Sequence, residues 1–172
     1  MGTKKGLKIQ ENKEIETQIK QAKLLTDQAF DIVECDEMWS FIQNKKQKCW
    51  IWLGICRFTK LILGFALGGR GSKTAKDFWS VISPHCQDTT KFPTDNWEAY
   101  KKIIPQEKHY IGKDETYTVE GYNASFRDDL GRLHRKTRAY SKSKKMLSYS
   151  LSCYIHKHNN LKLKLLNSML GV

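Results

Sequence analysis

Long apolar runs are missing from this sequence. No stretch reaches about 18 consecutive apolar residues, the length that a helix needs to cross a bilayer. The first residues, MGTKKGLKIQENKE, also lack the apolar core of a secretion signal. We therefore expect neither a membrane-spanning helix nor secretion, and the predicted location is the cytoplasm.

Cysteine is scarce and carries no pairing pattern. The five cysteines are odd in number, and no two of them form a C-x-x-C pair. This favours reduced core residues in a cytosolic protein over a disulfide framework or a zinc site. The cysteines are Cys35, Cys49, Cys56, Cys86 and Cys153.

Acidic residues are in deficit, with 18 Asp and Glu against 30 Lys and Arg in 172 residues, which gives a formal net charge of +12. The length suits one domain with a substantial core. The positive charge clusters, because eight of the nineteen residues from 127 to 145 are basic. That density favours a phosphate-binding surface for nucleic acid, with a membrane surface as the competing polyanion and a solvated helix face as the simpler alternative. The cluster comprises Arg127, Arg132, Arg135, Lys136, Arg138, Lys142, Lys144 and Lys145.

The apolar pattern predicts strands first and helices later. Period-two and fully apolar runs predict strands at 31–42, 49–58, 61–69, 91–95 and 109–112. Helical spacing predicts helices at 72–82 (with Ser72 as N-cap), 96–104, 117–133 and 139–169. A meander followed by alternating elements implies an α/β fold, a mixed sheet with helices packed on it. Residues 1–30 are expected to form a helical lead-in or linker, and 31–172 the main domain with basic C-terminal helices.

Three carboxylates stand out against this basic background. Asp36 lies mid-strand with Glu34 on the same face, whereas Glu37 points to the other face with Trp39. Asp95 ends a short strand directly before a helix, where it could instead serve only as the helix N-cap. Glu120 begins a helix at the margin of its apolar stripe, where a solvated glutamate is the simpler alternative.

Together these acids form a set of hard oxygen ligands. Such ligands suit Mg²⁺ or Mn²⁺. Two such ions could activate a water or a 3′-hydroxyl and stabilise the leaving oxygen in an attack on phosphate. Without a metal, the acids would repel the nucleic acid that the rest of the surface attracts.

Four motifs, in order, resemble the DDE transposases of the insertion-sequence-one family. Twenty-four residues separate Asp95 from Glu120, which is similar to the interval in that family. The resemblance covers about residues 31–158. The motifs are DEMWSF at 36–41, TDNWEAY at 94–100, EGYN at 120–123 and RKTRAYSKSKKML at 135–147.

The resemblance implies an RNase H-like fold, with a mixed five-stranded sheet and Asp36, Asp95 and Glu120 as catalytic, metal-binding residues. It implies cleavage of transposon-end DNA and strand transfer into target DNA, with Mg²⁺ or Mn²⁺ as two ions. A homo-oligomer and a nucleoid association in a prokaryotic host are expected. The residues expected to bind nucleic acid are Asn123 and the basic cluster of Arg127, Arg132, Arg135, Lys136, Arg138, Lys142, Lys144 and Lys145.

Two positions depart from the family pattern. Asn96 stands where the family usually has Gly, and Gly121 stands where the family commonly has Arg. Gly121 lowers the stability of its helix, so Glu120 is held less firmly. The family's zinc-binding and helix-turn-helix segments have no counterpart in these residues. End recognition is then expected on a separate domain, carried by another polypeptide or by a longer frameshifted product, or nowhere. Two other functions therefore stay open: a catalytically silent DNA-binding fragment, and another RNase H-like nuclease.

Overall fold

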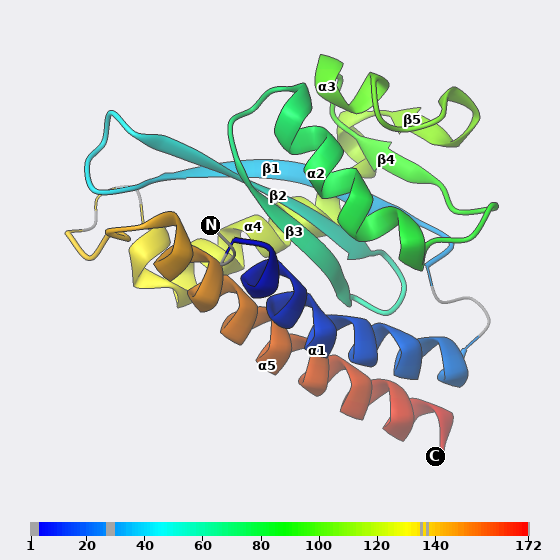
Figure 1. Cartoon of the computed structure of the whole chain (residues 1–172). Coiled ribbons are helices and arrows are strands. Elements are labelled where there is room, and N and C mark those ends of the chain that lie inside the picture. The colour runs from blue at the N-terminus through cyan, green and yellow to red at the C-terminus, as the bar shows by residue number, and fades with distance from the viewer. Residues whose placement is uncertain (1–3, 27–29, 135, 137, 172) are drawn as a thin grey trace.

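The computed structural model describes residues 4–26, 30–134, 136 and 138–171 of the chain. It has five strands, as the apolar pattern predicts (Figure 1). Within these residues no helix combines the length and the apolar character that a membrane span requires. The strands are β1 (Val33–Phe41), β2 (Lys48–Cys56), β3 (Ile62–Gly68), β4 (Phe92–Thr94) and β5 (His109–Ile111).

The first three strands form an antiparallel meander, and β4 and β5 form a parallel pair. β2 is central and buried on both faces because its residues are apolar on both sides. A parallel bridge between Ile32 and Lys91 joins the two sheets at the start of β1, so the order across the molecule is β3-β2-β1-β4-β5. Asp36 lies beyond this bridge.

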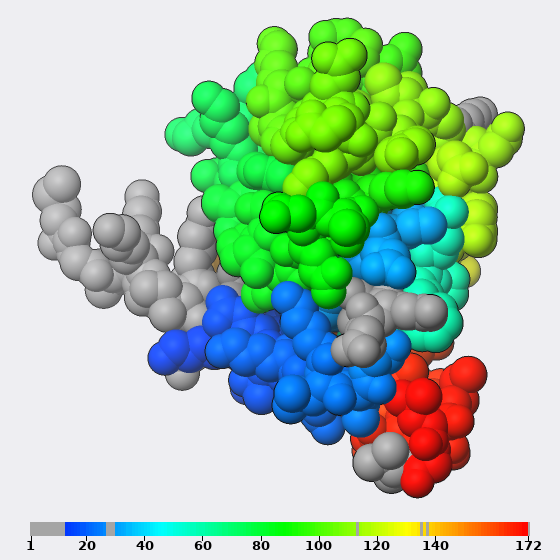
Figure 2. All heavy atoms as spheres, turned by 90° about the vertical axis from the view of Figure 1, so that its right-hand side faces the viewer, coloured from blue at the N-terminus to red at the C-terminus, as the bar shows by residue number. Residues whose placement is uncertain are grey.

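Helices cover both faces of the sheet (Figure 1). α2 packs on β2 and β3, and Gly54 and Gly64 leave room there for Ile82 and Val81. α1, α4 and α5 lie on the other face, and the space-filling view shows α1 beside the C-terminal end of α5 (Figure 2). The helices are α1 (Lys4–Leu25), α2 (Ser72–Ile82), α3 (Glu98–Lys101), α4 (Tyr117–Asp129) and α5 (Lys144–Leu170), with 3₁₀ turns at Ser83–His85, Gln106–Lys108, Lys113–Glu115 and Gly131–Leu133.

Several helix boundaries differ from the prediction. The N-cap of α2 is Gly71 rather than Ser72, and it makes no side-chain cap bond. α4 ends at Asp129 rather than residue 133, and α3 is a single turn. α5 starts at Lys144 rather than 139, because Ser143 Oγ accepts a hydrogen bond from the Met146 amide at 3.1 Å and caps it.

The N-terminal helix is integrated with the rest of the fold. Ile15, Ile19 and Ala22 are buried, and the helix packs against α5. This confirms a helix in the predicted lead-in, whereas the domain boundary at residue 30 stays a prediction. All five cysteines are free. Cys153 is exposed, so the prediction of a core position is wrong for that residue.

Candidate active site

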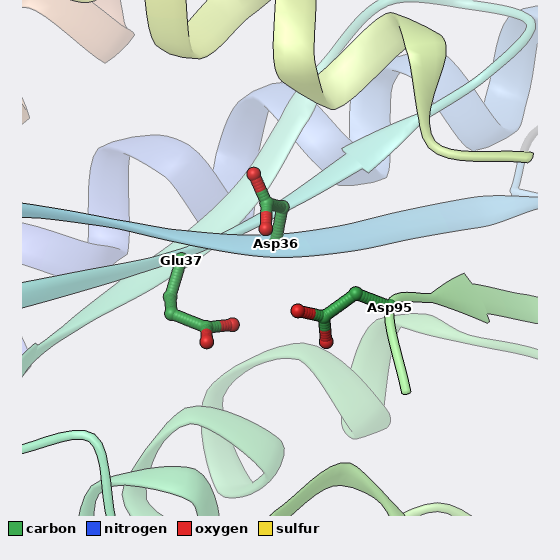
Figure 3. A group of neighbouring side chains, drawn as sticks. All are labelled: Asp36, Glu37 and Asp95. Carbon is green, nitrogen blue, oxygen red and sulfur yellow. The ribbon is translucent and has the colours of Figure 1, made fainter. Parts of the chain in front are cut away.

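Three acids converge where β1 and β4 separate. Carboxylate oxygens of Asp36, Glu37 and Asp95 lie within 4.8 Å of one another. Asp36 projects from one side of β1, while Glu37 and Asp95 face each other on the other side (Figure 3). The structure therefore brings two of the sequence-predicted acids together, and it adds Glu37.

Glu37 is buried and both of its carboxylate oxygens are engaged. Oε1 accepts a hydrogen bond from Arg70 Nε at 2.6 Å, and Oε2 accepts one from the Tyr100 hydroxyl at 2.8 Å. Burial raises the pKa of Glu37 to about 7, against the lowering effect of these two hydrogen bonds. Its engaged oxygens favour a structural pair with Arg70 over a role as metal ligand.

Asp95 follows β4 and is held from two directions. Its Oδ1 accepts a hydrogen bond from the Trp97 amide at 3.0 Å, and its Oδ2 lies 3.6 Å from Arg70 Nη2. The N-cap of α3 is Trp97 rather than Asp95, although Asp95 does bond the backbone just before that helix. Its side chain remains 40% exposed, which leaves it accessible to a ligand.

Asp36 is half-buried and bonded to a neutral side chain of α4. The amide Nδ2 of Asn123 donates a hydrogen bond to Asp36 Oδ2 at 2.6 Å. Burial, together with the charges of Asp95 and Glu120, raises the pKa of Asp36 to about 6, against the lowering effect of its hydrogen bonds. No ion pair to Asp36 occurs among the residues that the structure describes.

Glu34 is fully buried and fixes the start of α4. Its Oε1 pairs with Arg57 Nε at 2.6 Å, and its Oε2 accepts a hydrogen bond from the Val119 amide at 3.0 Å. Arg57 also bonds the backbone oxygen of Glu115 and its carboxylate. The carboxylate satisfies one of the free amides at the helix N-terminus, so α4 is anchored to β1 at this point.

Glu120 lies on the first turn of α4 and is exposed. Its Oε1 accepts a hydrogen bond from the Thr116 hydroxyl at 2.9 Å, and it is outside the group of three converging acids. Its charge nevertheless acts on Asp36. The side chain is within electrostatic range of Asp36 and is turned toward its own helix.

The residues expected to bind nucleic acid differ in their exposure. Asn123 is buried against Asp36, so its amide nitrogen has a partner within the site. Lys136, Arg138, Lys142, Lys144 and Lys145 are exposed, and Arg127 and Arg132 are partly buried. Arg135 lies outside the described residues.

Sequence reasoning missed Arg57, Arg70 and the engagement of Glu37. The signal was present, because a buried carboxylate in an apolar strand requires a cation. Arg57 lies just after β2, and Arg70 lies just after β3. β2 pairs with β1, and β3 pairs with β2, in antiparallel register, so the ends of β2 and β3 lie close to the acids of β1. Strand alternation alone could not tell which basic residue would pair with which acid.

Comparison with solved structures defines the fold class. The chain is similar to the Mos1 transposase of a paired-end complex with the left transposon end, with a TM-score of 0.50 and 10% identity. The match covers 95% of this chain and 60% of that chain. At that identity the likeness shows the fold, and the predicted RNase H-like α/β class is confirmed.

Sequence comparison defines the family. A model described as IS1 transposase matches residues 30–161. The insertion element iso-IS1n protein InsB of Shigella dysenteriae is 30% identical over 127 residues, which are 74% of this chain and 95% of the relative. The insertion element IS1 4 protein InsB of Escherichia coli K12 is 30% identical over 73% of this chain and 76% of its own length. The chain belongs to the IS1 transposase family, as its motifs predict.

Proposed function

We propose that this chain is the catalytic domain of a DDE transposase that cleaves transposon-end DNA and transfers a strand into target DNA. The observation that carries the proposal is the convergence of Asp36 and Asp95 where β1 and β4 separate. In a family of transposases, two carboxylates at such a position are suited to metal-dependent phosphoryl transfer.

The donors at the site fit Mg²⁺ or Mn²⁺. Asp36, Asp95 and Glu120 offer carboxylate oxygens, the ligands that these ions prefer. Asn123 Oδ1 is buried and has no hydrogen-bond partner among the described residues, so a polar group remains to be satisfied beside Asp36. Two bound ions would supply an activated water or 3′-hydroxyl and would stabilise the leaving oxygen.

The chain's own residues orient these ligands. Asn123 fixes the rotamer of Asp36 through its 2.6 Å hydrogen bond. Glu34 and Arg57 fix the start of α4, and that helix carries both Glu120 and Asn123. Glu120 would turn from Thr116 toward Asp36, a rotamer change of one exposed side chain.

Alanine variants at the three acids test the proposal. Asp36→Ala, Asp95→Ala and Glu120→Ala should each lower metal-dependent nicking and strand transfer by more than about a hundredfold. The matched control is Glu98→Ala, which removes an exposed acid whose ion pair, among the described residues, is with Lys101 at 2.8 Å within its own helix. Wild-type cleavage in all three variants would exclude this set of ligands.

The basic cluster is proposed to bind DNA phosphates without reading sequence. Lys142→Ala and Lys145→Ala should each weaken DNA binding and reduce the slope of log K against log salt by about one. Lys45→Ala, on the exposed β1–β2 hairpin, is the matched control and should leave the slope unchanged. Equal slopes for all the variants would remove the cluster from the interface.

The position of Glu120 favours one alternative, a DNA-binding protein without catalysis. Its carboxylate is exposed and bonded to Thr116, outside the converging acids. That alternative predicts salt-dependent DNA binding and no cleavage with any divalent metal. Homo-oligomerisation and a separate end-recognition domain stay predictions, which sedimentation with paired transposon ends would test.

A further inference from the structure

Arg70 lies beside the converging acids, in the short link between β3 and α2. Its Nε is 2.6 Å from Glu37 Oε1, and its Nη2 is 3.6 Å from Asp95 Oδ2. The guanidinium therefore connects a fully buried carboxylate to an accessible one. The buried partner is fixed in turn by the Tyr100 hydroxyl, which donates to Glu37 Oε2.

Two tryptophan side chains hold the backbone of this link. Trp52 Nε1 donates to the carbonyl of Gly69 at 3.1 Å, and Trp97 Nε1 donates to the carbonyl of Arg70 at 2.9 Å. Trp97 thus bonds both sides of the contact, because its own amide donates to Asp95 Oδ1. The link and the loop after β4 are fastened together at this residue.

Two indole rings also fix the guanidinium itself. Arg70 Cζ lies 4.6 Å from the centroid of the Trp50 ring and 4.1 Å from that of Trp97. Stacking and a directed fork of donors are properties of arginine, and lysine reproduces only the charge. The guanidinium is therefore pre-organised in one orientation toward Asp95.

We propose that Arg70 is a positioning residue that fixes the carboxylate of Asp95 for metal binding. This inference rests on the proposed function, in which Asp95 is a ligand. Asp95 is 40% exposed on a loop, and among the described residues its carboxylate otherwise accepts one hydrogen bond, from the Trp97 amide. Loss of Arg70 would leave Oδ2 free to rotate away from Asp36, so the ligands would have to be ordered when the ion binds.

A role through charge alone makes the opposite prediction. A cation beside the site repels Mn²⁺, so its removal would strengthen metal binding if orientation did not matter. Two variants therefore distinguish the effect of orientation from the effect of charge on metal binding. Arg70→Lys keeps the charge and loses the fork and the stacking, and Arg70→Gln loses all three.

The experiment is calorimetric titration of the full chain with Mn²⁺, without DNA, alongside strand-cleavage assays. Both variants should bind Mn²⁺ about tenfold or more weakly, the effect expected for residues that orient metal ligands. They should also need correspondingly more Mn²⁺ for half-maximal cleavage. Lys48→Gln is the matched control, since it removes a cation 5.1 Å from the Trp39 ring centroid. It should bind Mn²⁺ like the wild type.

Near-wild-type affinity of Arg70→Lys, or tighter binding by Arg70→Gln, would overturn the inference. If neither variant folds, Trp97→Phe decides, because it keeps an aromatic ring and removes the N–H that holds the Arg70 carbonyl. Weaker Mn²⁺ binding by Trp97→Phe would support the inference, and unchanged binding would overturn it.

The two proposals fail in different ways. Wild-type Mn²⁺ binding by Asp36→Ala and Asp95→Ala would overturn the proposed function. Loss of binding in those variants, with unchanged binding in the Arg70 variants, would overturn the positioning role alone.

Discussion

Two buried glutamates, Glu34 and Glu37, lie on opposite faces of β1, and each pairs with an arginine at 2.6 Å. Glu34 binds the start of helix α4 through the Val119 amide, and Arg57 binds Glu115 in the 3₁₀ turn that precedes this helix. Glu37 and Arg70 bind Tyr100 and extend to Asp95. One pair therefore fixes a helix, and the other fixes a loop.

Asp36 lies between these two glutamates in the sequence and differs from both. Its hydrogen bond comes from a neutral amide, and within the described residues no arginine or lysine forms an ion pair with it. A half-buried carboxylate with a raised pKa and no cation is the one that a metal ion would satisfy. Glu34 and Glu37 thus each have an arginine partner that holds the structure, whereas Asp36 has none in the part of the chain that the structure describes and is the acid that we propose as a metal ligand.

The largest effect, on both cleavage and the unfolding free energy, should come from Asp36→Asn. Metal-dependent cleavage should fall by more than about a hundredfold. Without metal, the unfolding free energy at pH 7 should rise, on the order of 1 kcal/mol, because the folded pKa of about 6 exceeds the ordinary value of 3.8 and the ionised form is disfavoured by folding.

Urea unfolding with and without Mg²⁺ measures this effect. Bound Mg²⁺ should reverse the order, since only the wild type gains stability from the ion. If the Asn variant were less stable than the wild type without metal, Asp36 would have a structural role like that of Glu34 and Glu37.

Glu34→Gln should show the opposite effect on stability. It leaves the Arg57 guanidinium, 20% exposed, without its buried partner and weakens the bond to the α4 amide. Breaking such a pair costs about 3 kcal/mol of unfolding free energy. Urea unfolding measures the loss, and the double variant Glu34→Gln/Arg57→Gln should cost less than the sum of its singles. An additive cycle would show that the pair is not coupled.

Glu37→Gln should have a smaller effect, within about 1 kcal/mol, because Arg70 is 35% exposed and can be solvated. Its signature is the pH dependence. The folded pKa of about 7 lies above the ordinary 4.5, so the wild-type unfolding free energy falls as pH rises between these values.

In the Glu37→Gln variant, the unfolding free energy should lose the part of its pH dependence that comes from Glu37. It should keep the part that comes from Asp36. Urea unfolding at pH 4.5, 6 and 7.5 measures the change of unfolding free energy with pH for the wild type and for the variant. The same change in both proteins would mean that Glu37 titrates normally.

The sequence was sufficient to select Asp36 and Asp95, which the structure brings together, and to give the succession of strands along the chain, because period-two patterns and short motifs are local signals. It was insufficient for Arg57 and Arg70, since their partners lie 23 and 33 residues away and only the folded register joins them. The start of α5 was also missed, because the Ser143 cap decides it more than the apolar spacing does. The acidic residues could be predicted from local sequence, whereas the contacts that orient their side chains could not.

The smallest effect should come from Gly121→Ala, next to Glu120 on α4. The Glu34 pair fixes where the helix begins, but Gly121 weakens the helix beyond that point. A Cβ there would meet no heavy atom within 4 Å, so alanine should raise the unfolding free energy by about 0.5 to 1 kcal/mol through helix propensity alone. Hydrogen exchange of the α4 amides should slow in the same variant, while exchange in β1 stays unchanged. If α4 exchange did not slow, its stability would be set by the Glu34 anchor rather than by its own turns.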